Sequence, residues 1–286
     1  MDMEIRATSS ERNVKIAIVD ISEALDEIIK LQKSNPLASV ALGRTIIANA
    51  LLSISIKDRS KMTTNINGMG LVGSIIAEFQ NDSIRGYIEN PNFDISLIKE
   101  NKGSPLSQAV GKMGFLQISR DNGEKEPYTS RVELVSGEIN IDFMYYLQQS
   151  DQINSLITTT VEINDDGSIK KACGIIIQLL PGFKDEDIDF IEKKVGSLEH
   201  LKKTLVDSTN YESLLKDICQ DAKVLEVKPL KFECTCDVRK VMDSIKLLGQ
   251  EEISNAYNKG EIIEVICDFC KKQYNIDSKD LKNLIN

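Results

Sequence analysis

Residues 231–238, KFECTCDV, and residues 264–272, EVICDFCKK, place four of the chain's six cysteines in two close pairs. In a strand, side chains at positions i and i+2 share a face, and a C-x-x-C turn is the usual knuckle of a zinc site. Four converging thiolates suit a tetrahedral Zn²⁺ ion and leave no open position for a catalytic water. The motifs therefore predict one closed zinc site with four ligands: Cys234, Cys236, Cys267 and Cys270.

Folding of residues 231–286, the segment that carries the predicted zinc site, is expected to depend on the metal, because this segment is short. Such a segment has a marginal core of its own, whereas a bound zinc ion supplies about 10–16 kcal/mol of folding free energy. Loss of the metal should therefore unfold the segment. Thiolates are also the form of cysteine that oxidants attack. An inert, purely structural site is the simpler alternative.

The two cysteine pairs differ in how easily each can close a disulfide. Cys267 and Cys270 flank a turn, where a local bond forms easily. In a fully extended strand, the Cα atoms of Cys234 and Cys236 lie about 6.6 Å apart and their Cβ atoms are too distant to bridge, so that segment has to bend first. We expect the C-x-x-C pair to oxidise first, the metal to leave, the segment to unfold, and the C-x-C pair to close later.

The cysteine motifs sit within a regular pattern of predicted elements. LKFECTC (residues 230–236) indicates a strand, and Asp237 is a suitable N-cap for the helix VRKVMDSIKLL, which Gly249 should end. EEISNAYNK indicates a second helix, stopped by Gly260. EIIEVICDFCKKQYNI (residues 261–276) indicates strand, turn and strand, followed by a final helix capped by Asp277 or Ser278.

The segment before the cysteines, residues 181–230, is predicted to be a helical linker. Six apolar residues recur there at helical spacing and predict one stripe along a single charged helix; they are Ile188, Ile191, Val195, Leu198, Leu201 and Leu205. After DSTN, Leu214, Leu215 and Ile218 indicate a second, shorter helix. Because such a stripe is stable only when something covers it, we expect a metastable linker docked on a neighbouring part of the chain.

Residues 1–180 mix strand and helix signals and predict an α+β domain rather than a regular βαβ array. NVKIAIVDI (13–21) indicates a strand and SEALDEIIKLQ (22–32) a helix. NPLASVALGRTIIANALLSISIK (35–57) predicts a long buried helix with Asn35 as N-cap and Pro36 at its first position. Three hairpins are predicted to turn at Asn81-Asp82, Asn122-Gly123 and Asp166-Gly167, and residues 136–151 are predicted to be helical.

Composition excludes several classes of function. The net charge is −9, which disfavours binding to the phosphate backbone of nucleic acids. MDMEIRATSS lacks the pattern of a secretory signal, and no apolar stretch is long enough for a membrane span, so a cytoplasmic location is expected. In that compartment a cluster of cysteines is typical of metal binding or redox chemistry rather than of structural disulfides.

Other features that resemble sites are interpreted as structural. GMGLVG (68–73) spells G-x-G-x-x-G, but a hairpin is predicted after it and a dinucleotide site needs a helix there. Its glycines are expected to serve turns or close backbone contacts. Cys173 and Cys219 are interpreted as small buried residues, and a lesser possibility is that Cys219 reacts once the linker opens. His200 is expected to be exposed on a helix.

The pattern C-x-C-x30-C-x-x-C resembles that of the redox-regulated bacterial chaperones known as the heat-shock protein of 33 kDa. The similarity continues through the preceding domain and follows the family's order over nearly the whole chain. It is carried there by LASVALGRTIIANALL (37–52), IRGYIENPNFD (84–94), residues 109–153 from AVGKMGF to SDQI, and GIIIQLLPG (174–182).

The resemblance implies a non-enzymatic switch. It implies that Cys234, Cys236, Cys267 and Cys270 bind one Zn²⁺ in a reduced, nearly inactive form. Oxidation would form Cys234–Cys236 and Cys267–Cys270 disulfides, release zinc, and unfold the zinc-binding domain (231–286) and the linker. The activated protein, often a homodimer, would then hold unfolding or oxidatively damaged proteins without ATP and prevent their aggregation during oxidative and heat stress.

Two other classes of function are weighed against the chaperone. A zinc-ribbon-like interaction or nucleic-acid module should have a basic tail, but residues 231–286 carry nine Lys or Arg and ten Asp or Glu. A thiol-disulfide oxidoreductase would use CDFC (267–270) at the start of a helix, whereas this motif is predicted to lie in a turn between strands. Both remain alternatives that experiment can separate from a holdase.

Overall fold

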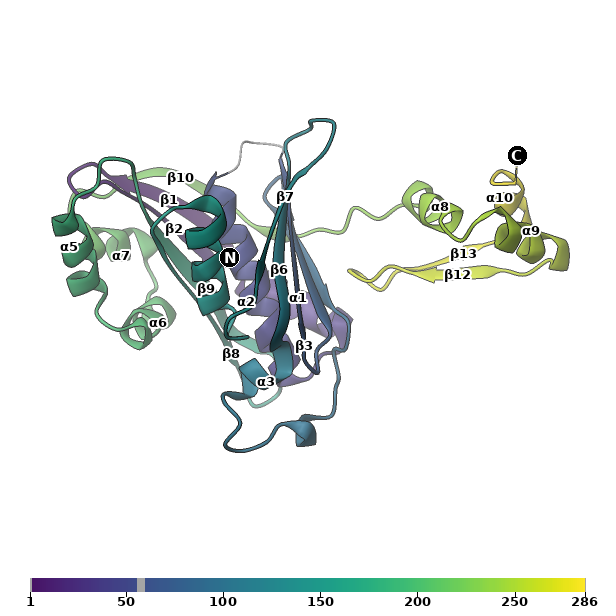
Figure 1. Ribbon diagram of the computed structural model, residues 1–286, viewed down its shortest axis with the longest axis horizontal. Helices are drawn as coiled ribbons and strands as arrows, with labels where there is room; N and C mark the ends of the chain where they lie inside the picture. The colour runs from purple at the N-terminus through teal and green to yellow at the C-terminus, as the bar shows by residue number, and fades with distance from the viewer. Residues whose placement is uncertain (1, 56–59, 286) are drawn as a thin grey trace. The chain divides into compact units, whose positions relative to one another are not determined.

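The computed structural model describes residues 2–55 and 60–285. The chain forms two compact units, which we call the N-terminal unit (Met1–Phe232) and the C-terminal unit (Glu233–Asn286). Figure 1 labels their helices and strands. Strands and helices alternate irregularly along the chain, which confirms the predicted α+β class.

The N-terminal unit contains two sheets. The five-stranded sheet has the order β10-β1-β2-β9-β8, and the six-stranded sheet has the order β11-β5-β4-β3-β6-β7. Neighbouring strands are antiparallel apart from β11, which is parallel to β5. The strands of the first sheet are β1 (Met3–Ser9), β2 (Val14–Asp20), β8 (Ser155–Ile163), β9 (Ile169–Leu179) and β10 (Lys223–Pro229). Those of the second are β3 (Lys61–Met69), β4 (Ser74–Gln80), β5 (Ser83–Ile88), β6 (Gly111–Asp121), β7 (Tyr128–Glu133) and β11 (Lys231–Phe232).

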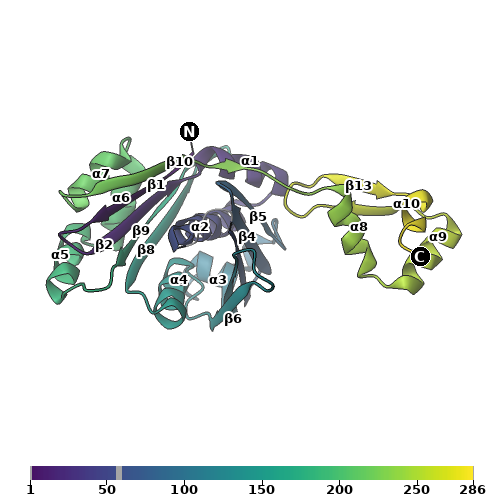
Figure 2. The ribbon, with the colours of Figure 1, turned by 90° about the horizontal axis from the view of Figure 1, so that it is seen from above.

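Helix α2 (Pro36–Leu52) lies between the two sheets and is apolar on nearly all sides (Figure 2). The side chain of Asn35 accepts a hydrogen bond from the backbone N–H of Ala38, which confirms the predicted cap. The helix ends five residues earlier than predicted, at Leu52, and a 3-10 turn (Ser53–Ser55) follows it. The last two residues of the predicted helix, 56 and 57, lie outside the described residues.

The three predicted hairpins are confirmed. They join β4 to β5, β6 to β7, and β8 to β9. Asn81 and Asp82 both have positive φ, at 50° and 60°, as the tightest of these turns requires. The remaining helices that precede the linker are α1 (Ser22–Gln32), α3 (Pro105–Val110), α4 (Asn140–Tyr146), a π-helical turn (Leu147–Asp151) and a 3-10 turn (Ile95–Leu97).

Three helices replace the two predicted for the linker: α5 (Asp185–Val195), α6 (Leu198–Asp207) and α7 (Tyr211–Ile218). The prediction of one continuous striped helix was wrong. Gly196 has a φ of 65°, and the side chain of Ser197 caps α6 by accepting a hydrogen bond from the backbone N–H of His200. A local break of this kind leaves the apolar spacing nearly unchanged, so the periodicity alone does not show it.

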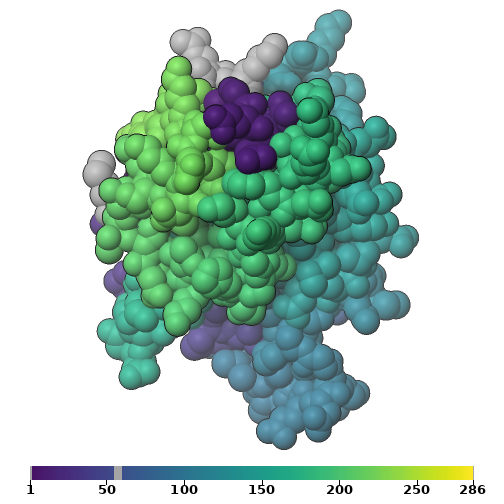
Figure 3. Space-filling model, turned by 90° about the vertical axis from the view of Figure 1, so that its left-hand side faces the viewer, coloured from purple at the N-terminus to yellow at the C-terminus, as the bar shows by residue number. Residues whose placement is uncertain are grey.

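These three linker helices cover one face of the five-stranded sheet. The apolar residues of α5, α6 and α7 share a buried cluster with residues of β1, β2 and β9, among them Ile5, Ile16 and Ile175. Figure 3 shows this side of the molecule, where the green helices form the surface. The neighbour on which the linker docks is therefore the sheet of the N-terminal unit.

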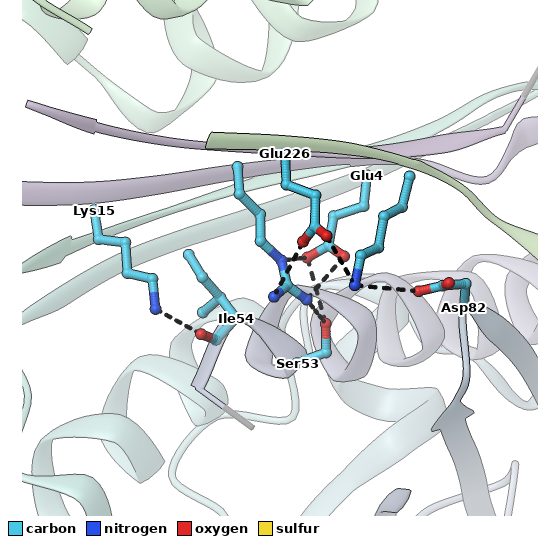
Figure 4. Close-up of polar contacts among 8 residues, drawn as sticks. Glu4, Lys15, Ser53, Ile54, Asp82 and Glu226 are labelled. Carbon is cyan, nitrogen blue, oxygen red and sulfur yellow. Dashed lines mark hydrogen bonds and ion pairs between the residues drawn. The ribbon is translucent and has the colours of Figure 1, made fainter. Parts of the chain in front are cut away.

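Strand β10, which the sequence analysis missed, continues from the linker helices along the edge of this sheet. Its alternating pattern, KVLEVKP, is the signal that could have revealed it. Figure 4 shows the polar cluster beneath it. Arg6 donates to both carboxylate oxygens of the buried Glu4, at 2.8 and 3.0 Å, and lies 3.9 Å from Glu226. Lys228 then pairs with Glu226 at 3.1 Å.

The C-terminal unit consists of a hairpin and three helices. The strands are β12 (Ile263–Ile266) and β13 (Gln273–Ile276), and the helices are α8 (Val238–Lys246), α9 (Gln250–Lys259) and α10 (Ser278–Lys282). Their small buried core includes Ile245, Ile253, Tyr274 and Leu281. Gly249, expected to end α8, instead has a φ of 92° and is the N-cap of α9.

Candidate metal centre

Four cysteine sulfurs meet in the C-terminal unit: those of Cys234, Cys236, Cys267 and Cys270 lie within 4.8 Å of one another. The Sγ atoms of Cys234 and Cys267 are 3.7 Å apart, and those of Cys236 and Cys270 are 3.4 Å apart. Four bonds of about 2.3 Å to a tetrahedral zinc ion would place the sulfurs about 3.8 Å apart. The donor set is therefore the right kind and nearly the right size for such an ion.

The C-x-C pair comes from a segment without helix or strand. The predicted strand over residues 230–236 was wrong, because only Lys231 and Phe232 pair with another strand, as β11 beside β5. Residues 233–237 are irregular and lead into α8, where Asp237 accepts a hydrogen bond from the backbone N–H of Lys240 at 2.9 Å. The position of Cys236 is thus set partly by the helix cap that follows it.

The C-x-x-C pair occupies the turn of the β12–β13 hairpin, as predicted. The backbone N–H of Cys267 donates to the carbonyl of Lys272 at 2.9 Å, and Lys271, with a φ of 59°, donates to the carbonyl of Cys267 at 2.8 Å. Backbone N–H groups of Phe269 and Cys270 also donate to the sulfur of Cys267. This turn holds two sulfurs on one side of the hairpin.

The electrostatic environment differs from one thiol to the next. Burial raises the pKa of Cys270 to about 12 and also raises the pKa of Cys267. Burial acts in the same direction on Cys236, but hydrogen bonds outweigh it, chiefly one from the Tyr274 hydroxyl, and lower the pKa to about 7. A metal ion binds thiolates, so it would have to displace the protons of the two half-buried thiols on the hairpin.

Tyr274 is the residue at this centre that the sequence analysis missed. Its hydroxyl donates a hydrogen bond to the Sγ of Cys236 at 3.1 Å. The only signal in the sequence is an aromatic residue four positions after Cys270, on the second strand of the hairpin.

The other residues singled out in the sequence lie elsewhere. Cys173, on β9, and Cys219, at the end of α7, are buried as predicted, and burial raises the pKa of the Cys173 thiol to about 12. His200 is exposed on α6, also as predicted.

The motif G-x-G-x-x-G serves backbone packing. Strand β4, not a helix, follows Gly73, which excludes the dinucleotide fingerprint. A Cβ atom at Gly68 would lie 2.3 Å from the carbonyl oxygen of Gly111, so glycine allows the two chain segments to approach closely. The prediction of a close backbone contact is confirmed. Among the described residues, none of the helices has the length and apolar character needed to cross a membrane.

Comparison with known proteins agrees with this architecture. The family model described as Hsp33 protein matches residues 2–277. The 33 kDa chaperonin of Shouchella clausii (strain KSM-K16) is 34% identical over 99% of this chain and 97% of its own length. That of Clostridium perfringens (strain 13 / Type A) is 33% identical over 99% of this chain and 90% of its own length.

A solved structure has the same fold. The crystal structure of the 33 kDa chaperonin from Thermotoga maritima superimposes with a TM-score of 0.86 at 29% identity, covering 99% of this chain and 97% of that one. The resemblance found in the sequence motifs is thereby confirmed. The full-length family match and these relatives show that the chain belongs to the Hsp33 family, the 33 kDa chaperonins, which are chaperones and not enzymes.

Proposed function

We propose that this chain is a redox-controlled, ATP-independent holdase of the cytoplasm that binds unfolding or oxidatively damaged proteins. The observation that carries the proposal is the meeting of four sulfurs in a C-terminal unit with a small core. Cys234, Cys236, Cys267 and Cys270 would hold one Zn²⁺ in the reduced protein. When bound, the ion supplies positive charge that keeps the four sulfurs together as thiolates.

Oxidation of the cysteines is the proposed trigger. Each pair, Cys234–Cys236 and Cys267–Cys270, would close a disulfide and so remove its two sulfurs from the ligand set. The C-terminal unit has a core of few residues, and the metal accounts for a large part of its folding free energy. Its disulfide-bonded form is therefore expected to unfold.

The linker helices supply the surface that is uncovered. Their apolar residues lie against Ile5, Ile16 and Ile175 of the five-stranded sheet, so their release would expose both the stripe and the sheet face. A contiguous apolar surface of this kind suits the capture of unfolded chains. We propose that the released form acts as a homodimer.

Release of the linker helices from the sheet has to break a set of polar contacts. The β1–β2 hairpin provides many of them: Arg12 lies 3.8 Å over the ring of Phe190, Ser9 donates to Asp221 at 2.6 Å, and Asp20 accepts from Tyr211 at 2.7 Å. Ser9, Asp20 and Tyr211 are buried, whereas Arg12, Phe190 and Asp221 are only partly buried, so release has to break both kinds of contact.

The test compares the reduced and the peroxide-treated full-length protein at mildly raised temperature. Zinc content, far-UV circular dichroism and suppression of citrate synthase aggregation are measured on the same samples. We expect oxidation to release about one zinc per chain, lower the helix signal and switch on suppression. Full suppression by the reduced, zinc-loaded protein would contradict the switch.

The oxidoreductase alternative is separated by an insulin-reduction assay. The C-x-x-C motif lies in a hairpin turn between β12 and β13, where the helix N-terminus that lowers a catalytic thiol pKa in such enzymes is missing. We therefore expect no catalysed reduction of insulin by the dithiol form. Catalytic turnover in that assay would favour the alternative.

A further inference from the structure

Tyr274 connects the two cysteine motifs within the C-terminal unit. It lies on β13, four residues after Cys270, yet its hydroxyl donates to the sulfur of Cys236 at 3.1 Å. The residue is 6% exposed, and its ring packs in the same cluster as Ile276 and Leu281. A buried tyrosine hydroxyl needs a hydrogen-bond partner, and here that partner is a cysteine sulfur.

The cysteine motifs are positioned by different means. Backbone N–H groups of the hairpin turn donate to the sulfurs of Cys267 and Cys270, so the turn itself orients these two. Cys236 belongs to the irregular segment 233–237 and receives its hydrogen bond from a side chain of the opposite element. The phenol therefore ties the C-x-C segment to the hairpin that carries the C-x-x-C turn.

We propose that Tyr274 is a positioning residue of this centre: its hydroxyl holds the Cys236 sulfur in the ligand set and makes the C-x-C pair the later one to oxidise. The proposal rests on the proposed function in taking the four cysteines as metal ligands. Groups that orient ligands in this way affect metal affinity strongly, since a misplaced ligand has to be reoriented on binding.

The chemistry of cysteine oxidation explains why the hydrogen bond from Tyr274 would make the C-x-C pair oxidise later. One cysteine sulfur attacks hydrogen peroxide, forming a sulfenic acid and releasing water; the sulfur of its pair then displaces a second water and closes the disulfide. In total two thiols give two electrons to one peroxide, which becomes two waters. The O–H···S hydrogen bond draws electron density from Cys236 and so lowers the nucleophilicity of that sulfur.

The first test measures zinc affinity in the reduced, full-length protein. Tyr274→Phe removes the hydroxyl and keeps the ring, and chelator competition gives the affinity for Zn²⁺ alone. We expect binding to weaken by about 10–100-fold. Tyr257→Phe is the matched control, because Tyr257 packs against the same cluster and has no hydrogen bond to a cysteine sulfur among the described residues. Affinity within about twofold of the parent protein would overturn the proposal.

The second test follows the order of disulfide formation. Zinc-loaded proteins, prepared with excess Zn²⁺ and checked by circular dichroism, receive a short peroxide pulse before alkylation and peptide mass spectrometry. In the parent protein and in Tyr257→Phe, the Cys267–Cys270 disulfide should accumulate first. In Tyr274→Phe, Cys234–Cys236 should form at a similar rate. An unchanged order in Tyr274→Phe would refute the claim about oxidation.

These readouts do not depend on chaperone activity. If oxidised protein fails to suppress aggregation while Tyr274→Phe still weakens zinc binding, the proposed function fails and the role of Tyr274 stands. If suppression is switched on normally and both readouts of Tyr274→Phe match the parent protein, only the role of Tyr274 fails.

Discussion

At the scale of single residues, the docking of the linker depends on a few polar side chains that reach across to the β1–β2 hairpin. Tyr211, the first residue of α7, is 8% exposed and donates from its hydroxyl to Asp20 at 2.7 Å. The same carboxylate accepts from Lys171 at 2.6 Å and from the hydroxyl of Ser22 at 2.6 Å. Despite its burial, these hydrogen bonds keep the pKa of Asp20 below its ordinary value.

Tyr211→Phe is predicted to loosen the linker without disturbing the sheet. It removes a hydrogen bond to a charged group, which contributes about 1.5–3 kcal/mol, and keeps the ring in its apolar cluster. Amide exchange of α6 and α7 in the reduced, zinc-loaded protein should accelerate, while exchange of β9 should not. Tyr128→Phe, at a residue of β7 that is 60% exposed, serves as the control. Equal protection of α7 in both variants would show that the hydroxyl does not fasten the linker.

Asp221 makes the docking of the linker dependent on pH. Ser9 donates to one of its oxygens at 2.6 Å and the backbone N–H of Glu11 to the other at 3.1 Å. Partial burial acts to raise its pKa, but these hydrogen bonds prevail and lower it from 3.8. A carboxyl whose folded pKa is depressed stabilises the docked state above its unfolded pKa, and the contribution is lost as pH falls through the folded value.

Because the pKa of Asp221 is lowered in the folded protein, the substitution Asp221→Asn should weaken linker docking at neutral pH but not at low pH. At pH 7 the variant should lose about 1 kcal/mol of linker docking, a small value because the site is partly solvated. Once the pH falls below the folded pKa of Asp221, the variant and the parent protein should converge, since the carboxyl is then protonated in both states. Exchange rates of α7 and β10 measured from pH 7 downward give the difference, and a gap that persists at low pH would contradict the assignment.

At the scale of elements, strand β10 separates the linker helices from residue 233, where the C-terminal unit begins. It pairs with β1 along Met3–Thr8, and β11 then pairs with β5. Glu226 and Lys228 face the body of the N-terminal unit, whereas Leu225 and Val227 are 56% and 48% exposed. The strand is therefore held by backbone pairing and charge rather than by apolar burial, so release of the linker helices also has to break these contacts.

Two substitutions distinguish the charges that hold this strand. Arg6→Ala leaves Glu4 buried without its cation and is expected to cost about 3–5 kcal/mol. Glu226→Ala keeps the Glu4–Arg6 pair and removes a half-exposed partner, with an expected cost below about 1 kcal/mol. Amide exchange should accelerate across β1 and β10 in the first variant and only within β10 in the second. Similar changes of amide exchange in the two variants would show that the buried Glu4 carboxylate does not depend on Arg6 for its stability.

At the scale of the whole molecule, the two units are expected to unfold separately when the metal is removed. The N-terminal unit has two buried clusters around its sheets, whereas the C-terminal unit has one small cluster. Since a metal held by the four cysteines would stabilise only the small unit directly, chelation of the reduced protein should abolish the protection of β12 and β13 and leave that of α2 intact.

Serine variants control for the chemistry of the chelator. Cys267→Ser/Cys270→Ser removes two ligands and should give the same exchange pattern as chelation, with no chelator present. Limited proteolysis should then cut after Phe232 and release a stable N-terminal fragment. A metal-free C-terminal unit that resists protease would show that its core is sufficient without the metal.

Sequence reasoning identified the elements whose signals are local. Asn35 and Asp237 act as caps within one turn, hairpin turns such as Asn81-Asp82 have their own backbone requirement, and the C-x-x-C turn lies within five residues. The break at Gly196 was missed because two helices in phase have nearly the same apolar spacing as one.

What the sequence determined by itself is the pair of thiol motifs, the caps, the hairpins and the α+β class, since each depends on neighbours in the chain. The tertiary structure decided that the linker docks on β1, β2 and β9, that Glu226 meets Arg6, and that Tyr274 reaches Cys236. Those contacts join residues far apart in sequence. Periodicity shows that a face must be covered, but only the folded chain determines what covers it.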